Sequence, residues 1–171
     1  MTKWMKAVSF AAHKHRHQLR RDGRTPFIAH PFRVALIVRD LFGVADEEVL
    51  AAAILHDTIE DTATDFDDIE EMFGRRVADL VSVLTKDMRL PEDEREREYD
   101  RRLAAGPWEA RLIKLADVYD NISDSVTAAV AIKAGDKVAR ALALVENEPH
   151  LVQAADLLRA QRDRLLNVEG A

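Results

Sequence analysis

The sequence contains no cysteine, and it has only 6 glycines and 5 prolines among its 171 residues. Without cysteine the chain can form no disulfide and no thiolate metal site, and it has no thiol nucleophile. Apolar residues make up 47% of the chain and charged residues 33%, which is typical of a folded globular protein rather than a disordered one. A chain of this length is expected to bury a substantial core.

Long apolar runs are also missing. The run LAAAIL at residues 50–55 is far below the roughly 20 residues that a membrane-spanning helix needs. The segment 1–21 turns basic too early for a secretory signal peptide, so we expect a cytoplasmic protein without a membrane partner. The net charge of −6 argues against a broad nucleic-acid surface, and the sequence favours no particular oligomeric state.

Helical periodicity dominates what is present, and no convincing strand-like alternation occurs. The sequence therefore predicts an all-α protein, a single helical bundle formed by residues 1–171, with its motifs at about 3–125 and C-terminal helices at 126–168. Asp46 is expected to cap one helix, and TDFD at residues 64–67 has the spacing of a capping box. Helices are predicted at residues 2–20, 31–42, 47–57, 69–73, 75–86, 91–103 and 108–122, with two more after residue 126.

The segment AAAILHDTIEDT, residues 51–62, carries the most informative cluster of polar residues. Its apolar run ends in His56, Asp57, Glu60 and Asp61, which would lie within an arc of roughly 140° on a continuous helix. Carboxylates beside an apolar core need a cation, and an imidazole among them favours a divalent metal ion. By itself the cluster is equally typical of a solvated helix end.

Two distant segments favour the metal site. FIAHP places His30 at the start of a helix, and IKLADVYDN places Asp117 at the end of an apolar run, with Asp120 and Asn121 following. Each residue alone has an ordinary structural explanation. Together with His56 and Asp57 they supply two imidazoles and two carboxylates, which are compatible with Mn, Fe or Zn.

These residues resemble the H…HD…D signature of the HD-domain metal-dependent phosphohydrolases, an all-α superfamily. The closer resemblance is to the hydrolase domain of RelA/SpoT proteins and to the small alarmone hydrolases, over about residues 3–125. It rests on FAAHKHRHQLRRDG, TPFIAHP, AAAILHDTIEDT, FGRRVADLVSVLTK and IKLADVYDN, which occur in the same order and spacing.

The resemblance implies one divalent ion, manganese in that family, bound by His30, His56, Asp57 and Asp117. It implies that a metal-bound water attacks the 3′-diphosphate of ppGpp or pppGpp, which gives GDP or GTP and pyrophosphate. Glu60 and Asp61 would orient or deprotonate this water.

The resemblance also implies a small-molecule nucleotide substrate. Arg20 and Arg21 would bind its phosphates and Asn121 would contact the nucleotide. The loop RRDGRTPFIAHP is one residue longer than is usual in the family and has Arg in place of Lys at its second position. Lys14, His15 and Gln18 match the family pattern KHxxQ, so His15 is expected to have a structural role near the site.

Other departures leave the substrate open. Ser123 stands where arginine is usual, and the alanine-rich segment 125–144 lacks an aromatic residue that often helps to form the nucleotide pocket. We expect a (p)ppGpp 3′-pyrophosphohydrolase. The alternative is an HD phosphohydrolase acting on another nucleotide, such as a nucleoside phosphate or the 2′-phosphate of NADPH. A non-catalytic nucleotide sensor is less favoured, because the ligand set and both carboxylates are complete.

Overall fold

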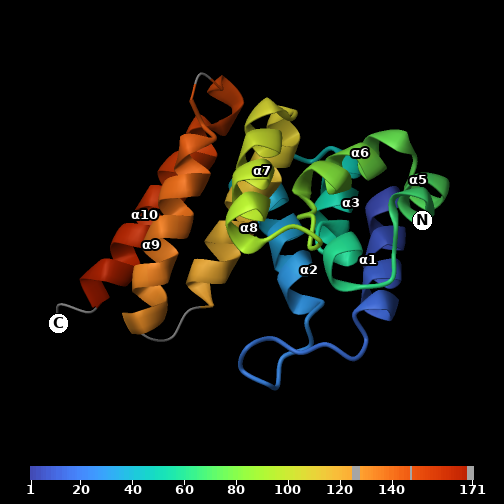
Figure 1. The fold of residues 1–171 in the computed structure, drawn as a ribbon, viewed down its shortest axis with the longest axis horizontal. Helices are drawn as coiled ribbons and strands as arrows, with labels where there is room; N and C mark the ends of the chain where they lie inside the picture. The colour runs from blue at the N-terminus through green and yellow to red at the C-terminus, as the bar shows by residue number, and fades with distance from the viewer. Residues whose placement is uncertain (125–127, 147, 169–171) are drawn as a thin grey trace.

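The computed structural model describes residues 1–124, 128–146 and 148–168, and within these ranges it contains helices but no strand. This confirms the predicted all-α class (Figure 1). None of the described helices combines the length and the apolar character needed to cross a membrane. The elements are α1 (Lys3–Lys14), α2 (Ala29–Leu36), the π-helical turn η1 (Ile37–Leu41), α3 (Glu47–Leu55), α4 (Thr58–Asp61), α5 (Phe66–Phe73), α6 (Arg75–Leu84), α7 (Glu92–Ala105), α8 (Trp108–Ser123), α9 (Ala128–Ala143), the 3₁₀ turn η2 (Pro149–Leu151) and α10 (Val152–Val168).

Helix α3 forms the centre of the core, because every residue from Val49 to Leu55 is buried. It packs against α1, α2, α6 and α8. Its three consecutive alanines allow these neighbours to approach closely. Asp46 caps α3 as predicted, since its side chain accepts hydrogen bonds from the backbone N–H groups of Glu48 and Val49.

Helix α8 lies between the N-terminal helices and the C-terminal pair (Figure 1). It contacts α2, α3 and α6 on one side and α9 and α10 on the other. Its buried residues recur along both sides of the helix, and they include Leu112, Ile113, Leu115 and Ile122. A polar residue on α8 can therefore face the N-terminal half of the fold from a fixed position.

The predicted continuous helix through His56 and Asp57 is wrong. Helix α3 ends at Leu55, the next two residues form a turn, and the one-turn helix α4 follows. The hydroxyl of Thr58 donates a hydrogen bond to the carbonyl oxygen of Leu55 at 2.6 Å, which stabilises this break. The single helical face assumed for the four polar residues therefore does not exist as such.

Two other helix ends also differ from the prediction. Helix α1 ends at Lys14 rather than near residue 20, and a loop containing the isolated β-bridge between Leu19 and Pro26 follows. The capping box of α5 joins Asp65 and Asp68 instead of residues 64 and 67. Thr64 is buried, and its hydroxyl accepts a hydrogen bond from that of Thr62 at 2.8 Å, so it is not the capping residue.

Candidate active site

Three helices bring two histidines and an aspartate together in the interior. His30 lies in α2, His56 directly follows α3, and Asp117 lies in α8. One donor atom from each residue lies within 4.8 Å of the others. The Nε2 atoms of His30 and His56 are 3.2 and 4.0 Å from Oδ1 of Asp117. These are three of the four metal ligands expected from the sequence.

Asp57, the fourth expected ligand, lies against the same two imidazole rings. Its Oδ1 is 3.1 Å from Nε2 of His56, and its Oδ2 is 3.7 Å from Nε2 of His30. The carboxylates of Asp57 and Asp117 thus each lie within 4.0 Å of the Nε2 atoms of both histidines.

Both imidazole rings are oriented through their Nδ1 atoms. His30 Nδ1 donates to Oδ2 of Asp120 at 2.7 Å, and His56 Nδ1 donates to the carbonyl oxygen of Ala53 at 2.8 Å. Because these acceptors carry no proton, the neutral rings present the lone pair of Nε2 to the cluster. The Nε2 atom of His56 is buried, and among the described residues it has no hydrogen-bond partner of acceptable geometry. This donor set fits a divalent metal ion.

The cluster needs a positive charge. Burial alone would lower the pKa of His56, but the charges of Asp57 and Asp117 and the close contacts with Asp57 and the Ala53 carbonyl together outweigh it and raise this pKa to about 9. Burial alone would raise the pKa of Asp117, but Lys114 and the two histidines hold it well below its usual value. A protonated imidazole or a metal ion can supply the charge that the carboxylates require.

Glu60 and Asp61 line a cavity of about 190 Å³ together with the four expected ligands. The carboxylate of Glu60 accepts a hydrogen bond from the backbone N–H of Lys86 at 2.9 Å. Burial and the charges of Asp57 and Glu60 raise the pKa of Asp61 to about 6. Asp61 is therefore a carboxyl group able to exchange a proton near neutral pH beside the candidate metal site.

The two arginines expected to bind phosphate are placed differently. Arg20 lines the 190 Å³ cavity, and its Nη2 donates to Oδ1 of Asn121 at 3.0 Å. The amide nitrogen of Asn121 in turn donates to Oδ1 of Asp117 at 2.5 Å. Arg21 is exposed and is not among the described residues that line this cavity. The structure thus brings Arg20 and Asn121 to the lining of this cavity, which does not include Arg21.

Two lysines and a tyrosine line the same cavity and were not predicted as site residues. Lys114 Nζ donates to Oδ2 of Asp117 at 2.7 Å, and it lies 5.4 Å from the centre of the Tyr99 ring. Lys86 forms an ion pair with Glu96 at 2.7 Å. Lys114 precedes Asp117 by three residues on the predicted helix, so helical spacing could have identified it. Lys86 has no comparable signal in the local sequence.

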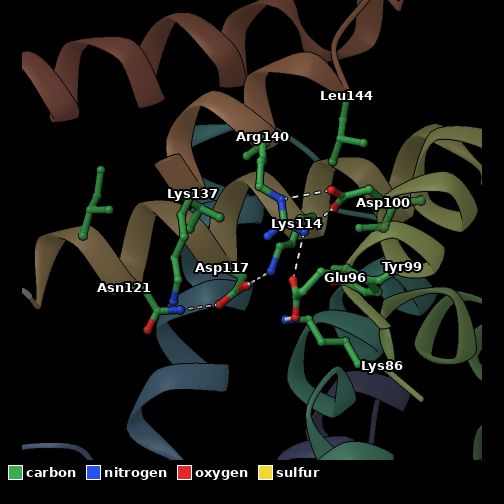
Figure 2. Close-up of a pocket in the computed structure, with 14 residues that line it drawn as sticks. Lys86, Glu96, Tyr99, Asp100, Lys114, Asp117, Asn121, Lys137, Arg140 and Leu144 are labelled. Atoms are coloured by element: carbon green, nitrogen blue, oxygen red, sulfur yellow. Dashed lines mark hydrogen bonds and ion pairs between the residues drawn. The ribbon is translucent and has the colours of Figure 1, made fainter. Parts of the chain in front are cut away.

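A second cavity, of about 90 Å³, lies between α7, α8 and α9 and shares Lys86, Tyr99, Lys114, Asp117 and Asn121 with the first. Figure 2 shows Lys137 and Arg140 extending into it from α9. Arg140 is paired with Asp100 and Glu96. Burial lowers the pKa of Lys137, and the charges of Arg21 and Lys114 lower it further. The site therefore continues into a second recess whose lining carries several cations.

Comparisons with known proteins agree with this geometry. Residues 7–157 match the family described as HD domain. The chain is 46% identical over 121 residues to the guanosine-3′,5′-bis(diphosphate) 3′-pyrophosphohydrolase MESH1 of Mus musculus, covering 70% of this chain and 68% of that protein. It is also 42% identical over 120 residues to a guanosine-3′,5′-bis(diphosphate) 3′-pyrophosphohydrolase of Aquifex aeolicus. This match covers 68% of this chain and 17% of that protein.

The fold is similar to a solved structure described as a metazoan ortholog of SpoT that hydrolyses ppGpp. The TM-score is 0.78 at 34% sequence identity, and the match covers 95% of this chain and 96% of that one. The predicted family and the predicted class of hydrolytic enzyme are confirmed. The chain belongs to the HD-domain family and, within it, is similar to the guanosine-3′,5′-bis(diphosphate) 3′-pyrophosphohydrolases.

Proposed function

We propose that this protein is a manganese-dependent (p)ppGpp 3′-pyrophosphohydrolase that releases pyrophosphate and leaves GDP or GTP. The observation that carries the proposal is that one cavity is lined by the candidate metal ligands, two further carboxylates and three cationic side chains. The names of the similar proteins support ppGpp as the substrate.

His30, His56, Asp57 and Asp117 would hold the ion. When bound, a divalent ion lowers the pKa of a coordinated water and offsets negative charge on phosphoryl oxygens. Asp120 keeps the ring of His30 in the orientation that this requires, because its carboxylate accepts a hydrogen bond from Nδ1.

Asp61 would act as the general base and Glu60 as the group that orients the attacking water. Asp61 has the raised pKa, so it can take a proton and release it again near neutral pH. Glu60 is tethered to the backbone of Lys86 and is therefore fixed in direction. The water oxygen forms a bond to the phosphorus nearest the sugar, the bond from that phosphorus to the 3′ oxygen breaks, and this oxygen takes up a proton.

The cations around the cavity match a substrate with two phosphorylated positions. Arg20, Lys86 and Lys114 line the cavity that contains the candidate metal ligands, where the 3′-diphosphate would lie. Lys137 and Arg140 line the adjoining recess, which is available to a second phosphate group of the nucleotide. Asn121 stands on the wall that the two cavities share, and we propose that it contacts the nucleotide.

Purified protein loaded with Mn²⁺ should convert ppGpp to GDP and pyrophosphate, which chromatography and a pyrophosphate assay would measure. A parallel panel should contain pppGpp, NADPH and simple nucleoside phosphates. If ppGpp stays intact while another member is hydrolysed, the substrate assignment fails and the wider HD phosphohydrolase assignment holds. Nucleotide binding with no turnover of any member would instead indicate a sensor.

A further inference from the structure

Helix α4, which carries Glu60 and Asp61, is a single turn of four residues. So short a helix is not stable alone, because its few internal hydrogen bonds do not offset the cost of ordering the backbone. Inside it, the backbone N–H of Asp61 donates to the carbonyl oxygen of Asp57 at 2.9 Å. The position of both carboxylates must therefore depend on contacts from other parts of the chain.

Two such contacts hold α4 from different segments. One is the hydrogen bond from the backbone N–H of Lys86 to the carboxylate of Glu60. The other comes from Gln18, whose side-chain Nε2 donates to the carbonyl oxygen of Asp61 at 2.8 Å, across 43 residues of sequence. The carbonyl of Asp61 lies at the C-terminal end of α4, where backbone carbonyls have no partner within the helix.

The amide of Gln18 is itself fixed in one orientation. A carbonyl oxygen can only accept, so the amide nitrogen must face Asp61 and Oε1 must face the other way. There Oε1 accepts from Nδ1 of His15 at 2.6 Å. His15 is buried and packs on Phe27 with ring centres 4.7 Å apart, and burial lowers its pKa, so the ring stays neutral. Both ends of the Gln18 side chain are thus held.

Gln18 also belongs to the loop that carries Arg20. Its carbonyl oxygen accepts from the backbone N–H of Phe27 at 2.9 Å, and the bridge between Leu19 and Pro26 continues this pairing. The backbone N–H of Arg20 donates to the carbonyl of Thr25 at 2.8 Å. One short paired segment therefore places the guanidinium of Arg20 at the cavity and supports α4.

We propose that Gln18 is a positioning residue for hydrolysis. By donating a hydrogen bond to the backbone carbonyl of Asp61, it keeps the carboxylate of Asp61 in a fixed position relative to the metal ligands. This inference rests on the proposed function, because it assigns Asp61 a part in the reaction. Gln18 does not line the 190 Å³ cavity, so it acts through Asp61 rather than on the substrate.

Gln18→Glu keeps the size of the side chain and the acceptor for His15, but it places a carboxylate oxygen against the carbonyl of Asp61. We expect kcat to fall about 10- to 100-fold, because a displacement of about 1 Å at the reacting groups has effects of this size. KM should change less than about twofold, and the bound metal per chain should stay the same. Gln18→Asn retains the amide but shortens its reach, so it should show the same pattern.

Gln153→Glu is the matched control. Gln153 in α10 also donates a hydrogen bond from Nε2 to a backbone carbonyl, that of Leu41, at 3.2 Å. Neither residue lines the 190 Å³ cavity. This variant should keep the wild-type kcat. If Gln18→Glu keeps the wild-type kcat, or loses metal and thermal stability in proportion to kcat, the positioning role is refuted.

A structural readout separates this inference from the proposed function. Crystal structures of metal-loaded wild type and Gln18→Glu should show a displaced Asp61 carboxylate with unchanged positions for His30, His56 and Asp117. An unmoved Asp61 overturns the inference whether or not ppGpp is a substrate. If ppGpp is not hydrolysed but Asp61 moves, the proposed substrate fails and the positioning of Asp61 by Gln18 stands.

Discussion

Asp120 connects the ring of His30 to the guanidinium of Arg33. Its Oδ2 accepts from Nδ1 of His30 at 2.7 Å, while Nε of Arg33 donates to its Oδ1 at 2.5 Å. Asp120 is 3% exposed, and these partners hold its pKa below the usual value although burial opposes this. The carboxylate therefore stays ionised and fixes the direction in which His30 presents Nε2.

Replacing Asp120 should weaken metal binding without removing a ligand. We expect Asp120→Asn to raise the Kd for Mn²⁺ about 10- to 100-fold, since the loss of partners behind metal-binding histidines has effects of this size. Calorimetry would measure it. Asp124→Asn is the control, because Asp124 also accepts from Arg33 but does not contact His30. Equal effects of the two changes would contradict the prediction.

Two other substitutions should distinguish the loss of metal binding from the loss of turnover. Asp117→Ala removes a carboxylate that faces both histidines, so the purified protein should contain no stoichiometric Mn²⁺ by elemental analysis. Glu60→Gln can still accept the hydrogen bond from Lys86 but loses its charge. It should retain the metal and lose turnover about 100-fold or more. Full metal content in Asp117→Ala would refute the ligand assignment.

The affinity for metal should depend on pH through His56. Its pKa is raised to about 9, so below that pH an incoming ion must displace a proton from the ring. The apparent association constant for Mn²⁺ should therefore rise as pH increases from 6.5 to 8.5, by up to about tenfold per unit. Calorimetry in buffers of different ionisation enthalpy should detect release of a proton. An affinity that does not change over this range would contradict the assignment.

Arg20 and Arg21 should contribute unequally to substrate recognition. Arg20 lines the cavity and donates to Asn121, whereas Arg21 is exposed. Hydrogen bonds to charged groups contribute about 1.5–3 kcal/mol, so Arg20→Ala should lower kcat/KM for ppGpp about 10- to 100-fold. Arg21→Ala makes the same chemical change at the next position and should have a much smaller effect. Equal losses would support the expectation from sequence that both bind phosphate.

The core around α3 should tolerate little change. Ile54 is fully buried, so Ile54→Ala should lower the free energy of unfolding by about 2–5 kcal/mol in urea denaturation. Val152, at 53% exposure, is the control, and Val152→Ala should change this free energy by less than about 0.5 kcal/mol. A small effect at Ile54 would mean that α3 is not the centre of the core.

Features set by local chemistry were predictable from the sequence. The cap at Asp46 and the ends of helices at Gly43 and Gly74 follow from capping preferences and positive-φ glycines. The capping box beginning at Asp65 was missed by one residue, because two overlapping frames have the same spacing and only the burial of Thr64 excludes the other. The break after Leu55 was missed because an apolar run indicates burial but does not show where the helix ends.

Some residues of the candidate site were likewise predictable from the sequence, and others were not. His30, His56 and Asp117 were identified through motifs, and the structure brings them together. The unequal placement of Arg20 and Arg21 depends on how the loop after α1 folds back on α8, which no local pattern encodes. The link from Gln18 to Asp61 is likewise a tertiary contact between segments far apart in the chain.

Because α3 is buried on all sides, the part of the fold around it tolerates fewer substitutions than the exposed parts do. A substitution in α3, the helix that His56 directly follows, disturbs several neighbouring helices at once, so this part of the molecule has few neutral variants. The side chain of Lys137 on α9 is exposed, and a replacement there costs little stability. Under the proposed function, substitutions at Lys137 would change the preference for nucleotides while the metal-binding groups around α3 stay in place.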